Sequence, residues 1–237
     1  MTVDFSKVSK EFNPSLFHPF YFIRQGLLKG IAKHAKEMKG KLLDFGCGSK
    51  PYQSFFNVDE YIGVDYENSG HPHANEQIDF FYDGKYLPFE NNSFDNVLCS
   101  EVVEHVFNLD EALHEIHRVL KPTGKLLITC PFVWSEHEVP HDYARYTQFA
   151  LKDILEKNGF EILSFNKSGN FIQTCFQLLV LYFYQQSNSK FLKFPPFRWL
   201  YKFLFYFILN VKGIFFSWLL PNNSTMYLNN IVLAIKK

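Results

Sequence analysis

Two glycines one residue apart lie in the segment Asp44–Gly48, directly after a short apolar run. Glycine has no Cβ atom, so such a turn lets the backbone approach a bound ligand closely. A dinucleotide-binding loop would have a third glycine where this chain has Pro51, and the Gly-Lys-Ser/Thr sequence of a P-loop is also missing. The turn is therefore poorly suited to phosphate, and taken alone it is also compatible with a purely structural tight turn.

Asp65 ends the next apolar run, 21 residues after Asp44. At the end of the second strand of a nucleotide-binding sheet, a carboxylate can accept hydrogen bonds from both ribose hydroxyls. A single aspartate at such a position can instead cap a turn or a helix. Because Asp65 accompanies the glycine turn at this spacing, we interpret it as a ribose ligand.

Several ionisable residues follow the fifth apolar run of the chain, namely His137, His141, Asp142 and Arg145. A group transfer to a hydroxyl needs a base to take up the proton, and histidine is the most common one. His141 is the first candidate for this base and His137 the second, with Asp142 and Arg145 as substrate contacts. In the structural alternative, His141 or Asp142 caps the helix that follows and Arg145 pairs with Asp142. The sequence leaves both interpretations open.

Metal-binding patterns are missing from the sequence. His114 and His117 are three residues apart, but they do not form a His-Glu-x-x-His motif, and His71 and His73 flank a proline. The four cysteines lack Cys-x-x-Cys spacing. We predict no bound metal, and reduced thiols in an intracellular protein.

Short apolar runs alternate with helical patterns along the chain, and glycines end several of them. A first helix is expected to lie across a sheet edge, and a later one to be capped by Asp110. Alternating strands and helices imply βαβ units and a parallel, doubly wound sheet, in which ligands bind beyond the carboxyl ends of the strands. The predicted helices are Phe17–Met38, Asp110–Leu120 and Leu151–Asn158, and the predicted strands are Lys41–Phe45, Tyr61–Asp65, Ile78–Tyr82, Phe94–Ser100, Lys125–Cys130, Phe160–Phe165 and Asn230–Lys236.

Several motifs occur in a recognisable order over roughly residues 38 to 165. Together they resemble the motifs of class I S-adenosylmethionine-dependent methyltransferases, in the small-molecule branch that is similar to ubiquinone and menaquinone biosynthesis methyltransferases. The resemblance implies an α/β, Rossmann-like fold with a seven-stranded, mostly parallel sheet whose last strand is antiparallel. The segments that carry it are Leu42–Gly48, Ile62–Asp65, Asp83, Leu87–Phe89, Asn92–Val97, Ser100–Val106 and Arg118–Leu126.

The resemblance also implies roles for individual residues and S-adenosylmethionine as the cofactor. Pro51 departs from the family pattern and implies a short, reshaped first helix. Methyl transfer needs alignment of donor and acceptor more than elaborate acid–base chemistry. The implied cofactor contacts are Gly46 and Gly48 along the methionine and ribose, Asp44 near the ammonium group, Asp65 at the ribose, Asp83 with Gly84 at the adenine, and Ser100 with Glu101 along the pocket, while His105 lies on the substrate side.

Charge divides the chain into two parts. All 24 acidic residues lie at or before Glu161, whereas eight basic residues follow it, so the first part carries about −8 and the second about +8. Such asymmetry indicates an anionic partner surface, either membrane or nucleic acid. Long apolar runs in the basic part argue against a solvated nucleic-acid groove, and we expect no nucleic acid.

The segments Phe171–Tyr184 and Trp199–Leu220 are strongly apolar and aromatic. A helix that spans a bilayer needs about 20 apolar residues. The first segment is too short, and polar residues such as Lys202 and Lys212 interrupt the second. Interfacial helices fit this pattern better. A lid over the active site, a membrane dock and a dimer-forming helical pair all remain open as interpretations.

The sequence therefore divides into an N-terminal helical segment (1–39), a methyltransferase domain (40–168 and 229–237) and a helical insertion (169–228). We expect an enzyme that methylates a small or lipid-linked acceptor, with oxygen as the methylated atom, in glycan or isoprenoid metabolism. The rival is an inactive cofactor-binding or membrane-scaffold protein. Without a signal peptide pattern at the N-terminus, we expect a cytoplasmic protein peripheral to the inner face of the membrane. The acceptor and the oligomeric state are left open.

Overall fold

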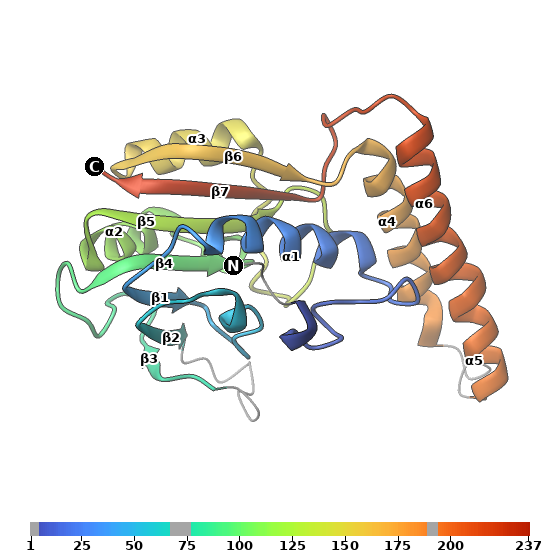
Figure 1. The fold of residues 1–237 in the computed structure, drawn as a ribbon, viewed down its shortest axis with the longest axis horizontal. Coiled ribbons are helices and arrows are strands. Elements are labelled where there is room, and N and C mark those ends of the chain that lie inside the picture. Colours follow the sequence, from blue (N-terminus) through green and yellow to red (C-terminus); the bar gives the residue numbers. More distant parts are fainter. Residues whose placement is uncertain (1–4, 67–76, 189–193) are drawn as a thin grey trace.

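The computed structural model describes residues 5–66, 77–188 and 194–237, and their core is one sheet with helices on both faces (Figure 1). The strands run in the order β3-β2-β1-β4-β5-β7-β6, so the chain leaves the middle of the sheet in both directions. They are β1 (Lys41–Phe45), β2 (Glu60–Tyr66), β3 (Phe80–Tyr82), β4 (Phe94–Ser100), β5 (Leu120–Pro131), β6 (Phe160–Ser168) and β7 (Asn229–Lys236).

Strand β7 is antiparallel to both of its neighbours, β5 and β6, while the other neighbouring strands are parallel. The predicted Rossmann-like sheet of seven strands with an antiparallel last strand is therefore confirmed. Strands β1 and β4 are adjacent, although β2 and β3 lie between them in the sequence. This is the point where the order of strands reverses, and open α/β sheets bind ligands there.

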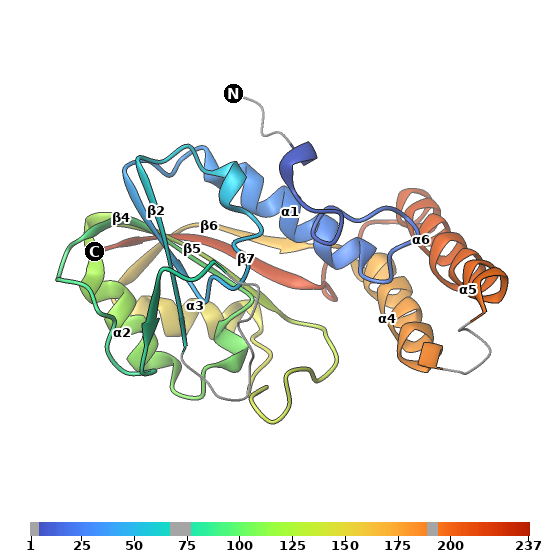
Figure 2. The ribbon, with the colours of Figure 1, turned by 90° about the horizontal axis from the view of Figure 1, so that it is seen from below.

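Helix α1 (Tyr21–Ala35) lies over the face of the sheet and contacts β5, β6 and β7, so the predicted position across a sheet edge is wrong (Figures 1 and 2). Its residues Leu28 and Ile31 are buried in a core that includes residues of β5 and β7. Gly30 allows a close approach, because a Cβ atom there would lie 2.1 Å from Ile231 Cδ1. The helix is also shorter than predicted.

Helices α2 (Leu109–Val119) and α3 (Gln148–Lys157) cover the opposite face (Figure 2). Leu113 and Leu151 are fully buried in a second core cluster there. The predicted cap at Asp110 is wrong, because Asn108 holds the N-cap position and makes no side-chain cap hydrogen bond. Asp110 instead accepts a hydrogen bond of 2.7 Å from Asn158, which ties α2 to the end of α3.

The crossover between β1 and β2 contains only one turn of 3-10 helix, η2 (Gln53–Phe55), as the short first helix predicted from Pro51 suggested. Tyr52 and Phe55 are buried in the core cluster beneath α1. Two aromatic side chains thus fill space that a full crossover helix would otherwise cover.

The insertion forms two packed helical segments at one end of the sheet. They are α4 (Phe171–Gln185) and the continuous helix Pro195–Leu219, which consists of α5 (Pro195–Lys202), the π-helical turn η6 (Phe203–Phe207) and α6 (Ile208–Leu219). Figure 1 shows the parallel strands β1, β4 and β5 pointing toward this helical pair. The insertion therefore stands near the edge where ligands bind in such sheets.

Among the described residues, the helix Pro195–Leu219 is the one segment that is long and apolar enough to cross a bilayer, and only 17% of its most apolar window is buried. Two residues that interrupt the apolar sequence of this helix, Asn210 and Gly213, face the protein. Asn210 is fully buried and donates hydrogen bonds to the carbonyl oxygens of Leu16 and His18. Gly213 lies against Phe22 and Phe176. One side of the helix is thus a protein contact and the other is exposed.

Candidate active site

The glycine turn joins the ends of β1 and β2. The backbone N–H groups of Gly46 and Cys47 both donate to the carbonyl oxygen of Val64, at 2.9 and 3.2 Å. Gly46 has a φ of +70°, and a Cβ atom there would lie 2.4 Å from Val102 Cγ2. Both the left-handed backbone and the close side chain of Val102 require glycine at this position.

Asp65 lies directly beside this turn. Its Oδ2 accepts a hydrogen bond of 2.8 Å from the backbone N–H of Gly48, and its Oδ1 accepts one from Tyr66. The carboxylate is only half-buried, so a ligand can reach it. The structure therefore brings together the two features predicted from their spacing, and Asp65 also fixes the turn, which was the structural alternative.

Asp44 is buried beneath the turn, with only 4% of its surface exposed. Tyr61 donates a hydrogen bond of 2.6 Å to its Oδ2. Burial raises the pKa of Asp44 to about 7, against the smaller lowering effects of the Tyr61 hydrogen bond and the Lys50 charge. A carboxylate in this state gains from a cationic ligand, because an opposite charge nearby favours its ionised form.

Buried Lys50 and exposed Asp79 form an ion pair under the turn that sequence reasoning missed. Lys50 Nζ donates to Asp79 Oδ2 at 2.5 Å, and the backbone N–H of Gly63 donates to the same oxygen at 2.7 Å. Lys50 is only 8% exposed and has a φ of 51°. Its stem runs over Gly63, where a Cβ atom would lie 2.3 Å from Lys50 Cε. The only sequence signal was a glycine inside a predicted strand, which often marks close backbone approach.

Asp83 and Gly84 follow β3 at the edge of the sheet next to the end of β2. Asp83 Oδ1 accepts hydrogen bonds from the backbone N–H groups of Lys85 and Tyr86, and these bonds lower the pKa of the exposed carboxyl. Gly84 has a φ of +83°, and a Cβ atom there would meet the ring of Tyr66 at 2.8 Å. Asp83 thus stays ionised as an acceptor on the same edge as Asp65.

Ser100 and Glu101 lie at the end of β4. Ser100 Oγ is 3.0 Å from Thr129 Oγ1, which in turn donates to Glu101 Oε1 at 2.9 Å. Asn229 donates to the other oxygen of Glu101 at 2.6 Å. Burial raises the pKa of Glu101 to about 7, and these two hydrogen bonds oppose the effect. Glu101 also has a φ of +56°, so the turn after β4 holds its carboxylate in a fixed place.

Glu104, His105 and His137 form the tightest ionisable cluster at this edge of the sheet. Their candidate ligand atoms all lie within 4.8 Å of one another, so these are the described groups best placed to hold a cation. Glu104 is fully buried, and neither of its carboxylate oxygens has a hydrogen-bond partner among the described residues. Burial, followed by the charge of Glu101, raises the pKa of Glu104. That no metal binds here stays a prediction.

The two histidines of this cluster lie within hydrogen-bond distance of each other. His105 Nδ1 lies 2.7 Å from the carbonyl oxygen of His141, which only accepts, so this nitrogen carries the proton. His105 Nε2 lies 3.1 Å from His137 Nε2, and His137 Nδ1 lies 3.3 Å from the carbonyl oxygen of Ser135. Arg145 Nη2 lies 3.3 Å from His137 Nδ1 and can donate to it. Burial, and then the charge of His105, lowers the pKa of His137.

Asp142 and Arg145 form a bidentate ion pair, in which Arg145 Nη1 and Nη2 donate to Asp142 Oδ1 and Oδ2 at 2.6 and 2.7 Å. Asp142 also accepts from the backbone N–H of His137 at 2.9 Å. The Arg145 hydrogen bonds lower the pKa of Asp142 to about 2. The pair expected under the structural alternative is therefore present, and it shapes the loop around His137.

The side chain of His141 is exposed and lies apart from this cluster, with its Nδ1 2.9 Å from the hydroxyl of Tyr143. The expectation that His141 or Asp142 caps the next helix is wrong, because Thr147 Oγ1 accepts from Ala150 and caps α3 itself. The structure thus separates the two histidine candidates: His137 contacts His105, whereas only the backbone of His141 does so.

Comparison with protein families places the core of this chain among the methyltransferases. Residues 43–128 match the family model described as a methyltransferase domain. The mitochondrial ubiquinone biosynthesis O-methyltransferase of Rattus norvegicus is 32% identical over 175 residues, which are 60% of this chain and 51% of the relative. An uncharacterised protein of Methanocaldococcus jannaschii is 38% identical over 96 residues, 39% of this chain and 41% of the relative. The chain thus spans about half the length of such relatives or less.

Solved structures share the fold at low sequence identity. A SAM-dependent methyltransferase from Archaeoglobus fulgidus has a TM-score of 0.53 and 17% identity, covering 96% of this chain and 97% of its own. The Haemonchus contortus phosphoethanolamine N-methyltransferase 2, in complex with S-adenosyl-L-methionine, has a TM-score of 0.53 and 22% identity over 100% of this chain and 60% of its own. Together, these likenesses show that residues 43–128 are similar to a methyltransferase domain and that the chain has the fold of class I S-adenosylmethionine-dependent methyltransferases.

Proposed function

We propose that this chain transfers the methyl group of S-adenosylmethionine to an oxygen atom of a small or lipid-linked acceptor. The observation that carries the donor half is the row of carboxylates Asp44, Asp65 and Glu101 at the ends of β1, β2 and β4, around a turn that accepts only glycine. The acceptor half rests on the His137–His105 pair beside it.

The residues present fit the cofactor. Asp44 is buried with a pKa of about 7, and a ligand ammonium group would stabilise its charged form. Asp65 has a half-buried carboxylate for the ribose hydroxyls, and the Gly46 backbone passes where a Cβ atom has no room. S-adenosylmethionine supplies a methyl group on a sulfonium, which is a good leaving group. The residues of the chain then have to align the acceptor and exclude water.

The proton of the acceptor hydroxyl can pass to a ring nitrogen of the neighbouring residues His105 and His137. A hydroxyl that enters between the two Nε2 atoms would donate to His105 Nε2, because the carbonyl oxygen of His141 holds the ring proton of His105 on Nδ1. As the oxygen gains the methyl group, its proton passes to His105. We therefore rank His137, as the partner that positions this exchange, ahead of the exposed His141.

A test of this assignment compares three proteins in an assay with radiolabelled methyl groups and extracted lipids as acceptors. His137→Gln keeps a polar side chain but loses the ring, and we expect turnover to fall about 100-fold. His141→Ala removes only an exposed side chain, and we expect turnover within about threefold of the parent. An equal loss of turnover in both variants would contradict the assignment of His137 as the residue that positions the acceptor hydroxyl. Cofactor binding without any turnover would support the inactive-scaffold alternative.

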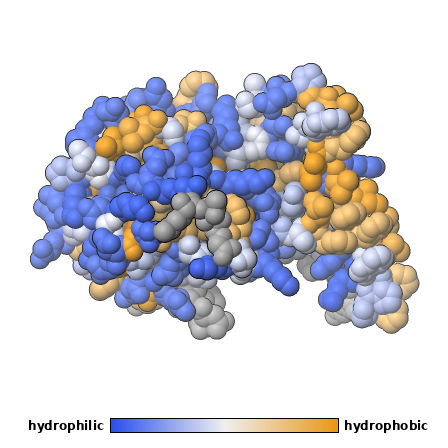
Figure 3. Space-filling model, viewed as in Figure 1, coloured by the Kyte–Doolittle hydropathy of each residue, from blue (hydrophilic) through white to orange (hydrophobic). Residues whose placement is uncertain are grey.

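The exposed side of the helix Pro195–Leu219 supports a membrane-associated role. Trp218 is 79% exposed and Phe215 50%, and Figure 3 shows hydrophobic surface gathered over the helical insertion. Lys202 and Lys212 are also exposed on this helix, and no acidic residue follows Glu161. Aromatic and basic residues on one helix are typical of interfacial docking on anionic lipid. We propose that the protein is cytoplasmic and docks on the inner face of the membrane.

Sedimentation with anionic vesicles tests the docking. The double variant Phe215→Ser and Trp218→Ser removes two aromatic side chains, each worth about 1.5–3 kcal/mol when fully buried. We expect vesicle affinity to fall at least about tenfold. The matched control is Phe149→Ser, because Phe149 is 74% exposed on α3. If both proteins bind vesicles as well as the parent, the docking proposal is wrong.

A further inference from the structure

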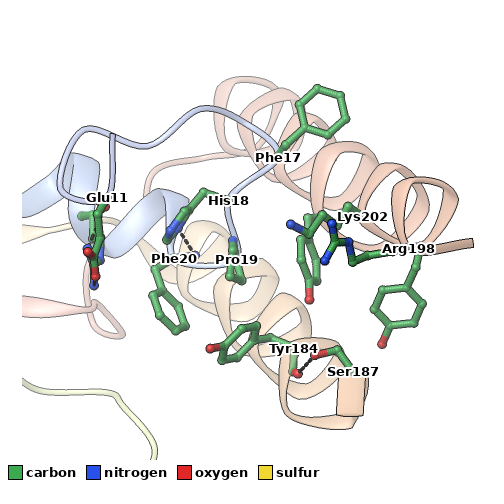
Figure 4. A pocket seen from close by; sticks show the side chains of 12 residues that line it. Glu11, Phe17, His18, Pro19, Phe20, Tyr184, Ser187, Arg198 and Lys202 are labelled. Carbon is green, nitrogen blue, oxygen red and sulfur yellow. Dashed lines mark hydrogen bonds and ion pairs between the residues drawn. The ribbon is translucent and has the colours of Figure 1, made fainter. Parts of the chain in front are cut away.

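A cavity of about 370 Å³ lies between the N-terminal segment and the helical insertion, away from the glycine turn (Figure 4). We name it the aromatic–basic pocket. Figure 4 shows Arg198 and Lys202 on one side, His18 opposite them and Tyr184 at the end of α4. Its lining residues are Glu11, Phe17, His18, Pro19, Phe20, Arg24, Tyr184, Ser187, Arg198, Tyr201, Lys202 and Tyr206.

The pocket carries an excess of positive charge. Three basic side chains line it, Arg24, Arg198 and Lys202, against the single carboxylate of Glu11. Glu11 already pairs with Arg24 at 3.3 Å. Within the described ranges, neither Arg198 nor Lys202 has an ion pair. Burial, and then the charge of Arg24, lower the pKa of His18; the charge of Glu11 opposes this effect, and Lys202 adds a smaller lowering.

The remaining lining combines aromatic walls with hydroxyl groups. Phe17 and Phe20 come from the N-terminal segment, and Tyr184 and Tyr206 from the insertion. The Tyr201 hydroxyl is already used, because it donates to the carbonyl oxygen of Phe183 at 2.6 Å. Guanidinium, ammonium and hydroxyl donors together favour a tetrahedral oxyanion, and phosphate esters are strongly bound by such groups.

The position of the pocket suggests where this anion comes from. Phe197 and Trp199 flank Arg198 and are 55% and 61% exposed, so the pocket opens beside the apolar side of the helix that we propose docks on lipid. On the other side, Phe20 packs edge-on against Trp134, which follows β5, with ring centroids 5.6 Å apart. The pocket therefore lies between the exposed apolar helix and the loop after β5, which carries His137.

We propose that the aromatic–basic pocket binds the phosphate group of a phosphate-bearing lipid, holding that group while the rest of the molecule reaches the methyl-transfer site. This proposal deepens the proposed function and rests on it for the link to methyl transfer, but phosphate binding itself can be measured without turnover. The shared chemistry is a phosphate ester, and the source is either a lipid or a soluble phosphate.

The experiment uses the full chain and the double variant Arg198→Gln and Lys202→Gln. Both side chains are exposed, so folding should be retained, and we check this by circular dichroism. The probes are soluble short-chain phosphatidic acid and inorganic phosphate, so that docking of Lys202 and Lys212 on a vesicle surface does not enter the measurement. Lys212→Gln is the control, because it removes a charge from the same exposed helix outside the pocket.

We expect saturable binding of short-chain phosphatidic acid, weakened at least about tenfold in the double variant and less than about twofold in Lys212→Gln. Equal binding of inorganic phosphate would support the pocket and assign a soluble source. Equal losses in both variants, or no saturable binding of either probe, would overturn the proposal. Affinity for S-adenosylmethionine should stay unchanged in the double variant, so a failed pocket is distinguishable from a failed methyltransferase assignment.

Discussion

The substitution Gly46→Ala tests whether the glycine turn is shaped for the cofactor. A non-glycine residue at a φ of +70° costs about 1–2 kcal/mol. The new Cβ atom would lie 2.4 Å from Val102 Cγ2, so the Val102 side chain must leave its rotamer or move, at a further cost of about 0.5–1.5 kcal/mol. The native turn is therefore disfavoured by roughly 1.5–3.5 kcal/mol.

This cost appears in cofactor affinity if binding requires the native turn. A turn that relaxes in the free protein must be restored on binding, so we expect the Kd for S-adenosylmethionine to rise about ten- to three-hundredfold. Isothermal titration calorimetry measures this Kd directly. Adding Val102→Ala removes both Cγ atoms and should recover the steric part of the loss but not the backbone part.

Gly159→Ala is the matched control for backbone strain. Gly159 has a φ of +84° and lies between α3 and β6, and its added Cβ atom would meet only the ring of His117, at 2.9 Å. We expect lower stability but a Kd within about twofold of the parent. If Gly46→Ala binds S-adenosylmethionine as tightly as Gly159→Ala does, the turn does not approach the cofactor and our reasoning fails.

Three further predictions concern buried polar groups. Because the pKa of Asp44 is raised to about 7, the affinity for S-adenosylmethionine should weaken as the pH falls through 7. Asp44→Asn should bind S-adenosylmethionine more weakly at pH 8 and lose this pH dependence. Titrations at several pH values measure both affinities, and the same pH profile in the two proteins would contradict us. Because burial raises the pKa of Glu104, its stabilising contribution is complete below its unfolded pKa and is lost as the pH rises through the folded value. In urea titrations above pH 5, the free energy of unfolding of Glu104→Gln should therefore exceed that of the parent by more than about 1 kcal/mol. A lower free energy of unfolding there would contradict the account. Asn210→Ala leaves two part-buried carbonyl oxygens without their donor, so we expect the free energy of unfolding to fall by about 1–3 kcal/mol in thermal or urea unfolding. An unchanged midpoint would show that the insertion is not anchored there.

The sequence predicted the sheet well because its strands are short apolar runs ended by glycine or polar residues, as at Lys41–Phe45. The positions of Asp44, Asp65 and Glu101 at strand ends were also predictable, since each follows or ends such a run. The bounds of elements were harder. Strand β5 begins at Leu120, before the predicted turn, because Leu120 pairs with Phe94; the register then shifts, and Thr123 has a φ of +62° there.

Long-range contacts account for most of what the sequence did not reveal. Asn229 reaches Glu101 from a strand 128 residues later in the chain, and only the antiparallel register of β7 brings them together. The same holds for His105 and His137, which come from different loops and meet at 3.1 Å. The position of α1 over the sheet face depends on Gly30 allowing close packing, which no local pattern indicates.

The central claim is that the edge of the sheet at Asp44 and Asp65 binds S-adenosylmethionine. Isothermal titration of the folded full chain tests it most directly, with Asp65→Ala as the comparison. The account predicts saturable binding to one site in the parent, weakened at least about tenfold in Asp65→Ala because the ribose contact and the hydrogen bond to Gly48 are both lost. A folded parent protein that shows no saturable binding, or an Asp65→Ala variant that binds equally well, would contradict it.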